Sequence, residues 1–214
     1  MTRAWAVIAA RGGDHAKSRL SPCLETADRA ELVACMLQDM LRALESCRRL
    51  DGILFTTPTP PLASIAAAFG VQPLRDPGLG LNEAFASAGA VLDAAHSQSA
   101  SVFLPGDLPL LEPREVDDLI ASLDRWPSVV VATSDGGTGA WARRAATPAE
   151  PRFGPDSARR HLEQIDGAYA APLGAYSSLR HDIDLPADLE GLAAAQRVSS
   201  LFVRAHCANL VRSS

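Results

Sequence analysis

Aromatic residues, cysteines and long apolar runs are all scarce in this sequence. Phe, Trp and Tyr together make up 5% of the 214 residues, although 47% of the chain is hydrophobic, so a core must consist mainly of Ala, Val, Leu and Ile. No segment reaches the roughly 18 apolar residues that a membrane-spanning helix needs. The apolar run at residues 5–10 is too short for a signal peptide and is followed by charged residues. We therefore expect a cytoplasmic protein with no membrane partner.

The few cysteines do not form the paired spacing of a metal-binding or redox motif. They are Cys23, Cys35, Cys47 and Cys207. Cys35 and Cys47 fall within one predicted helix, where a disulfide between them is out of reach. We expect free thiols in a reducing compartment.

Positive charge is also scarce. Lys and Arg number 20 against 25 Asp and Glu, which gives a formal net charge of −5, and no basic tract is present. This balance excludes a general nucleic-acid partner. It does not exclude a small anionic ligand held by a few well-placed cations.

Apolar runs of strand length alternate with segments of helical periodicity along the first 132 residues. The helix over about residues 28–47 has the clearest pattern, because its apolar side chains recur on one face, and Asp28 is its expected N-cap. Strands are predicted at 5–9, 53–56, 71–74, 101–104 and 129–132, and further helices between the prolines at 58–61 and Ala68, at 82–95 and at 113–123. This alternation is typical of an α/β fold with a mainly parallel sheet and right-handed crossovers.

The alternation ends after residue 134. A stretch rich in Gly, Pro and Arg extends to about residue 155, and a helix is predicted at 157–165. A strand at 179–183 and a helix beginning near Pro186 follow. We expect one domain over residues 1–214, with about 134–178 inserted on one side of it.

Four polar clusters fall where an open parallel sheet binds ligands, beyond the carboxyl ends of its strands. The first cluster is the segment 11–19, in which two glycines precede Lys17 and Arg19. Glycines let a backbone approach a phosphate, and the two side chains supply positive charge. The segment matches neither the P-loop nor the GxGxxG pattern. A solvated basic turn is the alternative.

Carboxylates form the second and third clusters. Asp107 follows a predicted strand within a Pro-, Gly- and Leu-rich setting, and Asp182 and Asp184 alternate so that both lie on one side of an extended segment. Mg²⁺ takes one or two carboxylates together with substrate phosphates, so it would explain both clusters. The alternatives are an Asx turn at Asp107 and a helix cap at Asp184 or another acid.

Two glycine turns form the fourth cluster. One lies at 135–140 and includes Thr138, and the other, at 152–157, includes Gly154 and Ser157. Such turns suit the capture of a small anion by backbone amides. A β-hairpin turn at the first and an N-cap at Ser157 are the alternatives. His161 reads more readily as a surface or capping residue than as a substrate contact.

In this order the clusters resemble a known family, the guanylyltransferases of coenzyme F420 biosynthesis, which join GTP to 2-phospho-L-lactate or phosphoenolpyruvate. The matching segments, in chain order, are Ala16–Leu20, Arg29 with Met36–Asp39, Gly78–Asn82, Leu104–Leu111, Gly136–Gly139, Arg152–Ser157 with His161, and Asp182–Leu189. Sugar-nucleotide and molybdenum-cofactor nucleotidyltransferases share the strand-end Asp, whereas the ordered set is specific. The resemblance covers nearly the whole chain.

The resemblance implies a single-domain, Rossmann-like nucleotidyltransferase fold of the nucleotide-diphospho-sugar transferase type, with helices on both faces of a mainly parallel sheet. By similarity, Lys17, Asp107 and Asp182 are the catalytic residues. Mg²⁺ would be held by Asp107, Asp182 and Asp184. The nucleotide would contact Arg11, Lys17, Arg19, Gly80, Asn82 and Gly106. The acid substrate would contact Thr138, Gly154 and Ser157.

Two positions depart from the family pattern. Arg11 stands where relatives usually end a Pro-Val-Lys segment, and Arg keeps the charge without the ammonium geometry. Trp141 stands near the position where many relatives carry Asn, and it reads as a packing residue or a lid. Because Trp141 is next to the acid-substrate side, the identity of the acceptor stays open.

The expected reaction is an in-line attack by a phosphate oxygen of the acid on the α-phosphorus of GTP, which releases pyrophosphate. That oxygen is already anionic, so no general base is needed. The acceptor is 2-phospho-L-lactate, phosphoenolpyruvate or 3-phosphoglycerate, and a homodimer is expected. The alternatives are another nucleotidyltransferase or a nucleotide-sugar glycosyltransferase on the same fold, or a non-catalytic nucleotide-binding homologue.

Overall fold

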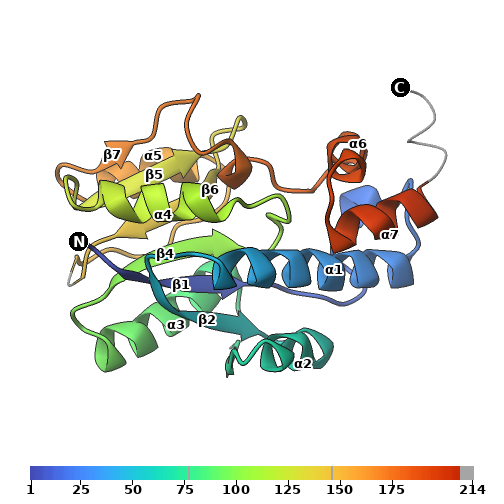
Figure 1. Cartoon of the computed structure of the whole chain (residues 1–214), viewed down its shortest axis with the longest axis horizontal. Coiled ribbons are helices and arrows are strands. Elements are labelled where there is room, and N and C mark those ends of the chain that lie inside the picture. The colour runs from blue at the N-terminus through green and yellow to red at the C-terminus, as the bar shows by residue number, and fades with distance from the viewer. Residues whose placement is uncertain (77, 146, 208–214) are drawn as a thin grey trace.

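The computed structural model describes residues 1–76, 78–145 and 147–207, which form a seven-stranded sheet with helices on both faces (Figure 1). The strands are β1 (Ala4–Ala9), β2 (Leu50–Thr57), β3 (Pro73–Arg75), β4 (Ala100–Pro105), β5 (Ser128–Ala132), β6 (Thr138–Arg143) and β7 (Tyr169–Ala170). The helices are α1 (Thr26–Glu45), α2 (Pro60–Ala68), α3 (Leu81–Ala95), α4 (Pro113–Ser122), α5 (Ser157–Glu163), α6 (Pro186–Ala194) and α7 (Val198–His206), with short 3₁₀ turns at Ser18–Leu20 and Ser177–Leu179. None of the helices in these ranges combines the length and apolar character that crossing a membrane requires.

The strands lie in the order β3-β2-β1-β4-β6-β5-β7. Every neighbouring pair is parallel except the two that involve β6, which runs antiparallel to both β4 and β5. Because of this reversal, the first residues of β6 lie at the same edge of the sheet as the last residues of the other strands. The mainly parallel α/β sheet expected from the sequence is confirmed.

Alternating side chains of the strands build two apolar layers. In β1, Ala6 and Ile8 face the layer that contains α1, α4, α6 and α7, whereas Val7 faces the layer that contains α3 and α5. Phe103 of β4 and Trp141 of β6 belong to the second layer, and their rings stack with centroids 4.8 Å apart. Phe85 and Phe153 join them in this layer, whereas the other layer contains Phe55 and Phe202.

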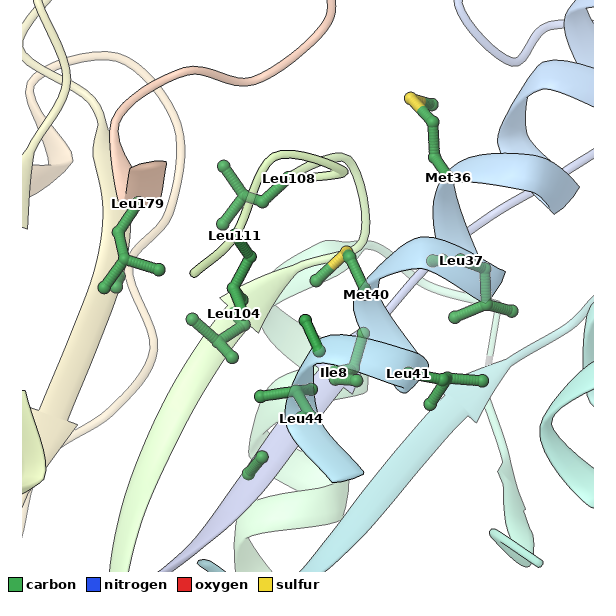
Figure 2. Packing of buried hydrophobic residues seen from close by; sticks show 14 of the residues in the cluster. Ile8, Met36, Leu37, Met40, Leu41, Leu44, Leu104, Leu108, Leu111 and Leu179 are labelled. Atoms are coloured by element: carbon green, nitrogen blue, oxygen red, sulfur yellow. The ribbon is translucent and has the colours of Figure 1, made fainter. Parts of the chain in front are cut away.

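Helix α1 covers the centre of the other face. Its Leu37, Met40 and Leu41 belong to the same apolar layer as Ile8 of β1, and Figure 2 shows α1 lying over this strand. The small side chains at Ala4 and Ala6 let a long helix lie close to the strand. Helix α7 packs against α1. Asp39 of α1 accepts hydrogen bonds from the Val198 and Ser199 amides and so caps the N-terminus of α7.

The loop after β4 is anchored in the same apolar layer. Leu108 and Leu111 are fully buried, and Figure 2 shows them between Met40 of α1 and Leu179. These buried side chains hold the backbone of the loop in place. Asp107 lies at the start of the loop, directly before Leu108.

Several elements differ from the sequence-based expectation, among them the short strand β7, which was not predicted. The predicted strand at 179–183 is wrong: a 3₁₀ turn ends at Leu179 and the following residues are irregular. The strand β6 was not predicted, because its apolar run at 140–142 is short and lies within the stretch rich in Gly, Pro and Arg. Helix α1 begins at Thr26, so Asp28 lies in its first turn and not at the N-cap, and Cys47 lies beyond its end at Glu45.

Gly139 of β6 permits a close backbone crossing at this point. A Cβ atom there would overlap the carbonyl group of Leu179. The segment after the 3₁₀ turn therefore lies directly on β6, at the edge where the polar clusters meet.

Gly139→Ala is expected to lower the free energy of unfolding by about 2 to 3 kcal/mol, because the backbone at Leu179 must move away. Gly174→Ala is the matched control, since a Cβ there meets nothing within 4 Å, and its effect should stay within about 0.5 kcal/mol. Urea denaturation of both variants measures the difference. Equal stabilities would contradict the proposed close crossing.

Candidate active site

The polar clusters converge at the carboxyl edge of the sheet. Asp107 lies two residues beyond the end of β4, and Thr138 begins the antiparallel β6 beside it. The segment 182–184 reaches the same place because the Ile183 amide donates a hydrogen bond to the Asp107 carbonyl, at 3.1 Å. Asp107 and Asp182, which are 75 positions apart in the chain, therefore share one site.

Lys17 lies among the carboxylates. Its backbone is left-handed, with a φ angle of 49°, and its ammonium donates a hydrogen bond to Asp107 Oδ2 at 2.7 Å. The same Nζ atom lies 3.6 Å from Asp184 Oδ1. Arg19 is largely exposed and pairs with the other oxygen of Asp184 at 2.6 Å. The structure thus brings together four residues from three clusters that are separate in the sequence.

Arg29 organises the loop that carries Lys17, a role that the sequence analysis did not assign. This buried guanidinium at the start of α1 donates to the carbonyl groups of Asp14, Ala16 and Leu24 and to the Thr26 hydroxyl. One side chain therefore satisfies three backbone acceptors of an irregular loop. In the sequence, the one indication of this role was an arginine on the apolar face of a predicted helix.

Asp188, and not Asp184, caps helix α6. Asp188 Oδ2 accepts hydrogen bonds from the Asp184 and Leu185 amides, at 2.9 and 2.6 Å. This arrangement supports one of the two capping alternatives left open by the sequence. It leaves the Asp184 carboxylate facing Lys17 and Arg19.

The electrostatic balance keeps the Lys17 ammonium charged. Burial by itself lowers the pKa of Lys17, but the carboxylates of Asp107, Asp184 and Asp182 outweigh it and raise the pKa above 10.5. The pKa of Asp182 is raised by burial and by the nearby charge of Asp107, and Lys17 offsets part of this increase. The site therefore contains excess negative charge that one ammonium only partly neutralises.

Asp107 has an unused oxygen that suits a cation. Its Oδ1 atom is buried and has no hydrogen-bond partner within the described residues, and a buried polar atom of this kind is costly. No group of three His, Cys, Asp or Glu side chains in the described ranges is preassembled as a metal site. Hard carboxylate oxygens at a site that would also bind phosphate nevertheless have the chemistry that Mg²⁺ requires.

Arg11 is held by a carboxylate that the sequence analysis overlooked. Its guanidinium lies 3.3 Å from the oxygens of Asp76, which follows β3 and is almost fully buried. Asp76 also accepts a hydrogen bond from the Gly78 amide at 2.6 Å. Arg11 is thereby fixed against the segment that leads to Gly80.

The remaining residues assigned to the nucleotide have structural contacts of their own. Gly106 lies so close to Ala10 that a Cβ could not be accommodated, and its amide donates to the Ala9 carbonyl. Gly80 has a φ angle of 149° at the start of α3. The Asn82 amide group pairs with both backbone groups of Phe153, at 2.6 and 3.1 Å, and so ties α3 to the second glycine turn.

Two adjoining cavities open on either side of Asp107. The first, which we call the Lys17 cavity, has a volume of about 260 Å³ and is lined by Ala9, Ala10, Arg11, Lys17, Val33, Met36, Leu81, Pro105, Gly106, Asp107 and Asp184. The second, the Thr138 cavity, has a volume of about 180 Å³ and is lined by Leu81, Pro105, Asp107, Leu108, Thr133, Asp135, Gly137, Thr138, Gly139, Phe153, Gly154 and Asp182. Because both contain Asp107, ligands in the two cavities would meet at this carboxylate.

The glycine turns form the far wall of the Thr138 cavity. The first is the β5–β6 hairpin turn, in which Asp135 accepts hydrogen bonds from the Thr133 hydroxyl and the Gly137 amide. The hairpin alternative is therefore the one found. Ser157 is not an N-cap, because it is the first residue of α5 and its hydroxyl donates to Thr138 Oγ1 at 2.9 Å.

His161 lies behind this wall and is fully buried, so the expectation of a surface or capping residue is wrong. Its Nδ1 atom lies 3.0 Å from Thr138 Oγ1, and its Nε2 accepts a hydrogen bond from the Arg152 amide. Its ring stacks on Trp141 with centroids 4.6 Å apart, which makes Trp141 a packing residue and not a lid. Burial, together with the charges of Arg160 and Arg152, lowers the pKa of His161 from 6.5 to about 4.

Solved structures from two other organisms share this fold. A structure from Desulfovibrio desulfuricans G20, assigned as a nucleotide-diphospho-sugar transferase, superposes with a TM-score of 0.79 over 99% of this chain and 98% of its own, at 18% identity. A cytidylyltransferase from Leptospira borgpetersenii superposes with a TM-score of 0.59, covering 100% of this chain and 98% of its own at 14% identity. The chain therefore has the fold of these two structures, with acidic residues at the carboxyl edge of its sheet.

Sequence comparison gives the particular family. A model described as "Guanylyl transferase CofC like" matches residues 4–192. The 3-phospho-D-glycerate guanylyltransferase of Phenylobacterium zucineum is 40% identical over 86% of both chains. The phosphoenolpyruvate guanylyltransferase of Nocardia farcinica is 38% identical over 86% of this chain and 83% of its own. The chain belongs to the CofC-like guanylyl transferase family, as its motifs indicated.

The buried His161 makes stability depend on pH. The unfolded chain takes up a proton at this residue near pH 6.5, whereas the folded chain does so only near pH 4. Stability is therefore lost as the pH falls through this window. Between pH 7 and pH 5 we expect His161 to account for a loss of about 2 kcal/mol.

Urea denaturation of the wild type and of His161→Asn at both pH values tests this expectation. The variant should be less stable at pH 7 but should lose less stability on acidification. Carboxylates titrate in both proteins, so their effect cancels in the comparison. The same loss on acidification in both proteins would show that His161 does not titrate in this way.

Proposed function

We propose that this enzyme transfers GMP from GTP to a phosphorylated three-carbon acid and releases pyrophosphate. Membership of the CofC-like family supports guanylyl transfer, and the names of the two relatives above support 3-phospho-D-glycerate or phosphoenolpyruvate as the acceptor. The single observation that carries the proposal for this chain is the pair of cavities that meet at Asp107. By its family, the reaction would be a step of coenzyme F420 biosynthesis, with 2-phospho-L-lactate as a third candidate acid.

The Lys17 cavity suits the nucleotide. Arg11 and Lys17 supply two positive charges at its wall, and Arg19 lies at the rim through its contact with Asp184. Apolar side chains of α1, including Val33 and Met36, form the rest of this wall. GTP would place its phosphates beside the two cations, with the α-phosphate next to Asp107.

The Thr138 cavity suits the acid. It is the smaller of the two, and it presents the Thr138 hydroxyl and the glycine backbone at Gly154. Ser157 contacts this wall from behind. Binding in adjoining cavities would align the phosphate oxygen of the acid with the α-phosphorus of GTP, and such positioning accounts for much of the catalysis of phosphoryl transfer.

No residue is needed as a general base. The Lys17 ammonium keeps its proton, because the surrounding carboxylates raise its pKa. It therefore acts as a fixed positive charge that stabilises the negative charge of the triphosphate. The attacking phosphate oxygen is anionic without any proton transfer.

Mg²⁺ would be held by Asp107, Asp182 and Asp184. The unpaired Asp107 Oδ1 and the raised pKa of Asp182 support this placement, because a bound cation would relieve both. When bound, Mg²⁺ neutralises phosphate charge and orients the phosphate groups for displacement. Asp107 lines both cavities, Asp184 lines the Lys17 cavity and Asp182 lines the Thr138 cavity, so the three carboxylates lie where the two ligands would meet.

A panel of substrates tests the proposed function. Each of GTP, ATP, CTP and UTP is mixed with Mg²⁺ and with one of the three acids, and pyrophosphate release is measured together with the product mass. We expect release only with GTP, with a product that joins GMP to an acid. Release with another nucleotide, or activity with none of the acids, would contradict the proposal. Sugar transfer from a GDP-sugar without pyrophosphate would instead identify a glycosyltransferase.

Asp107→Asn is expected to lower pyrophosphate release by about 100- to 1,000-fold, because it removes charge where the reacting phosphates meet. The variant should stay folded, since the Asp107 backbone contacts that hold 182–184 are unchanged. Asp118→Asn is the matched control, because Asp118 lies exposed on α4 and pairs only weakly with Arg114. Near-normal release by Asp107→Asn would remove Asp107 from the catalytic machinery.

A further inference from the structure

Another cavity lies between helices α1 and α7, which pack side by side (Figure 1). Its volume is about 450 Å³, and its walls include Asp39, Arg42, Arg197, Leu201 and Arg204. None of the residues that line it also lines the Lys17 cavity or the Thr138 cavity. We call it the arginine cavity, because three arginines gather there in a chain whose formal net charge is −5.

The acidic residue in the wall of the arginine cavity already has partners for its charge. Asp39 Oδ1 accepts a hydrogen bond from the Val198 amide, and Oδ2 accepts hydrogen bonds from the amide and the hydroxyl of Ser199. Asp39 is 3% exposed. The positive end of the α7 dipole also offsets its negative charge. The cavity therefore presents positive charge to a ligand.

The three guanidinium groups differ in how they are held. Arg197 pairs with Glu112 at 2.7 Å, and within the described part of the chain it is the one of the three that has a carboxylate partner. Arg204 donates to carbonyl groups at the end of α6, which orient its guanidinium without neutralising it. The Arg42 guanidinium lies over the ring of Phe69, 5.9 Å from the ring centroid. Two of the three positive charges therefore have no carboxylate paired with them in these ranges.

An exposed apolar side chain lies between two of the arginines. Leu201 is 63% exposed. Along the helix it follows Arg197, the N-cap of α7, by four residues and precedes Arg204 by three, so the three side chains share one face. A ligand that matches this face carries anionic groups on a short carbon skeleton. An inorganic anion would match the charges alone.

We propose that the arginine cavity is a second ligand-binding site, which takes a small organic molecule with two or more anionic groups. Guanidinium groups bind carboxylates and phosphates alike through paired N–H donors, so both kinds of anionic group fit. The volume is within the usual range of sites for small molecules. The contacts that already orient Arg197 and Arg204 lower the entropic cost of binding. The site is separate from the cavities that meet at Asp107.

Calorimetric titration of the whole chain at low salt, without GTP or Mg²⁺, tests the proposal. The probes are citrate, which carries carboxylates, fructose 1,6-bisphosphate, which carries phosphates, and inorganic phosphate. We expect at least one of the two organic anions to bind with a Kd below about 1 mM, and inorganic phosphate to bind more weakly. The organic anion that binds more tightly identifies the anionic group that the site prefers.

Three variants locate the binding in the arginine cavity. Arg42 is exposed near the end of α1, so Arg42→Gln should stay folded, and we expect it to weaken binding of the preferred organic anion by about tenfold. Leu201→Ala should weaken that binding by about threefold and leave inorganic phosphate unaffected. Arg125→Gln is the matched control, because it removes the same charge at an exposed position after α4, and it should bind like the wild type. The melting temperature of each variant checks its fold.

The proposal is wrong if neither organic anion binds the wild type in the expected range. It is also wrong if a folded Arg42→Gln variant binds the preferred anion as tightly as the wild type, because the anion is then held elsewhere, for example by the cations of the Lys17 cavity. Inorganic phosphate that binds as tightly as the organic anions, or an unchanged Kd in Leu201→Ala, would show that the carbon skeleton is not recognised. No GTP is present and no turnover is measured, so these results do not depend on the proposed function.

Discussion

The ion pair between Lys17 and Asp107 is the interaction on which the rest of the candidate active site depends. Three carboxylates lie at one edge of the sheet, and without a cation their mutual repulsion would force them apart or raise their pKa values. The Lys17 ammonium, 2.7 Å from Asp107 and 3.6 Å from Asp184, offsets that repulsion. The left-handed backbone at Lys17 and the buried guanidinium of Arg29 hold the loop so that this contact forms.

Much of this arrangement could be predicted from the sequence. Strands separated by helices define a mainly parallel sheet, and an open parallel sheet places strand-end residues at one edge. Asp107 and the segment 11–19 were therefore assigned to the site from their position after a strand. The carboxylates near residue 182 were assigned by charge pattern and by resemblance. Family comparison supports the same fold and the same class of enzyme.

The rest depends on contacts between residues distant in the sequence. Strand β6 forms because two neighbouring strands supply hydrogen-bond partners on both sides, although its own apolar run is only three residues long. The segment at 179–183 has the alternation of a strand but no neighbouring strand with which to pair. Arg29 bonds the Asp14 and Ala16 carbonyl groups, and Asp76 pairs with Arg11 of another loop, and no local pattern indicates these contacts. The burial of His161 likewise depends on Trp141, 20 positions earlier in the chain.

The close backbone contact at Gly139 connects the wall of the Thr138 cavity to the loop that contains Asp107. The Leu179 carbonyl lies against Gly139 of β6, and four residues later the Ile183 amide is bonded to the Asp107 carbonyl. This short length of chain is a strap between the wall that carries Thr138 and the loop that carries Asp107. Exchange of the Thr138 wall between relatives must therefore include the strap through Asp184. If the exchanged segment ended at residue 178, the strap would no longer fit the backbone of the new wall at Gly139. We expect that mismatch to displace Asp182.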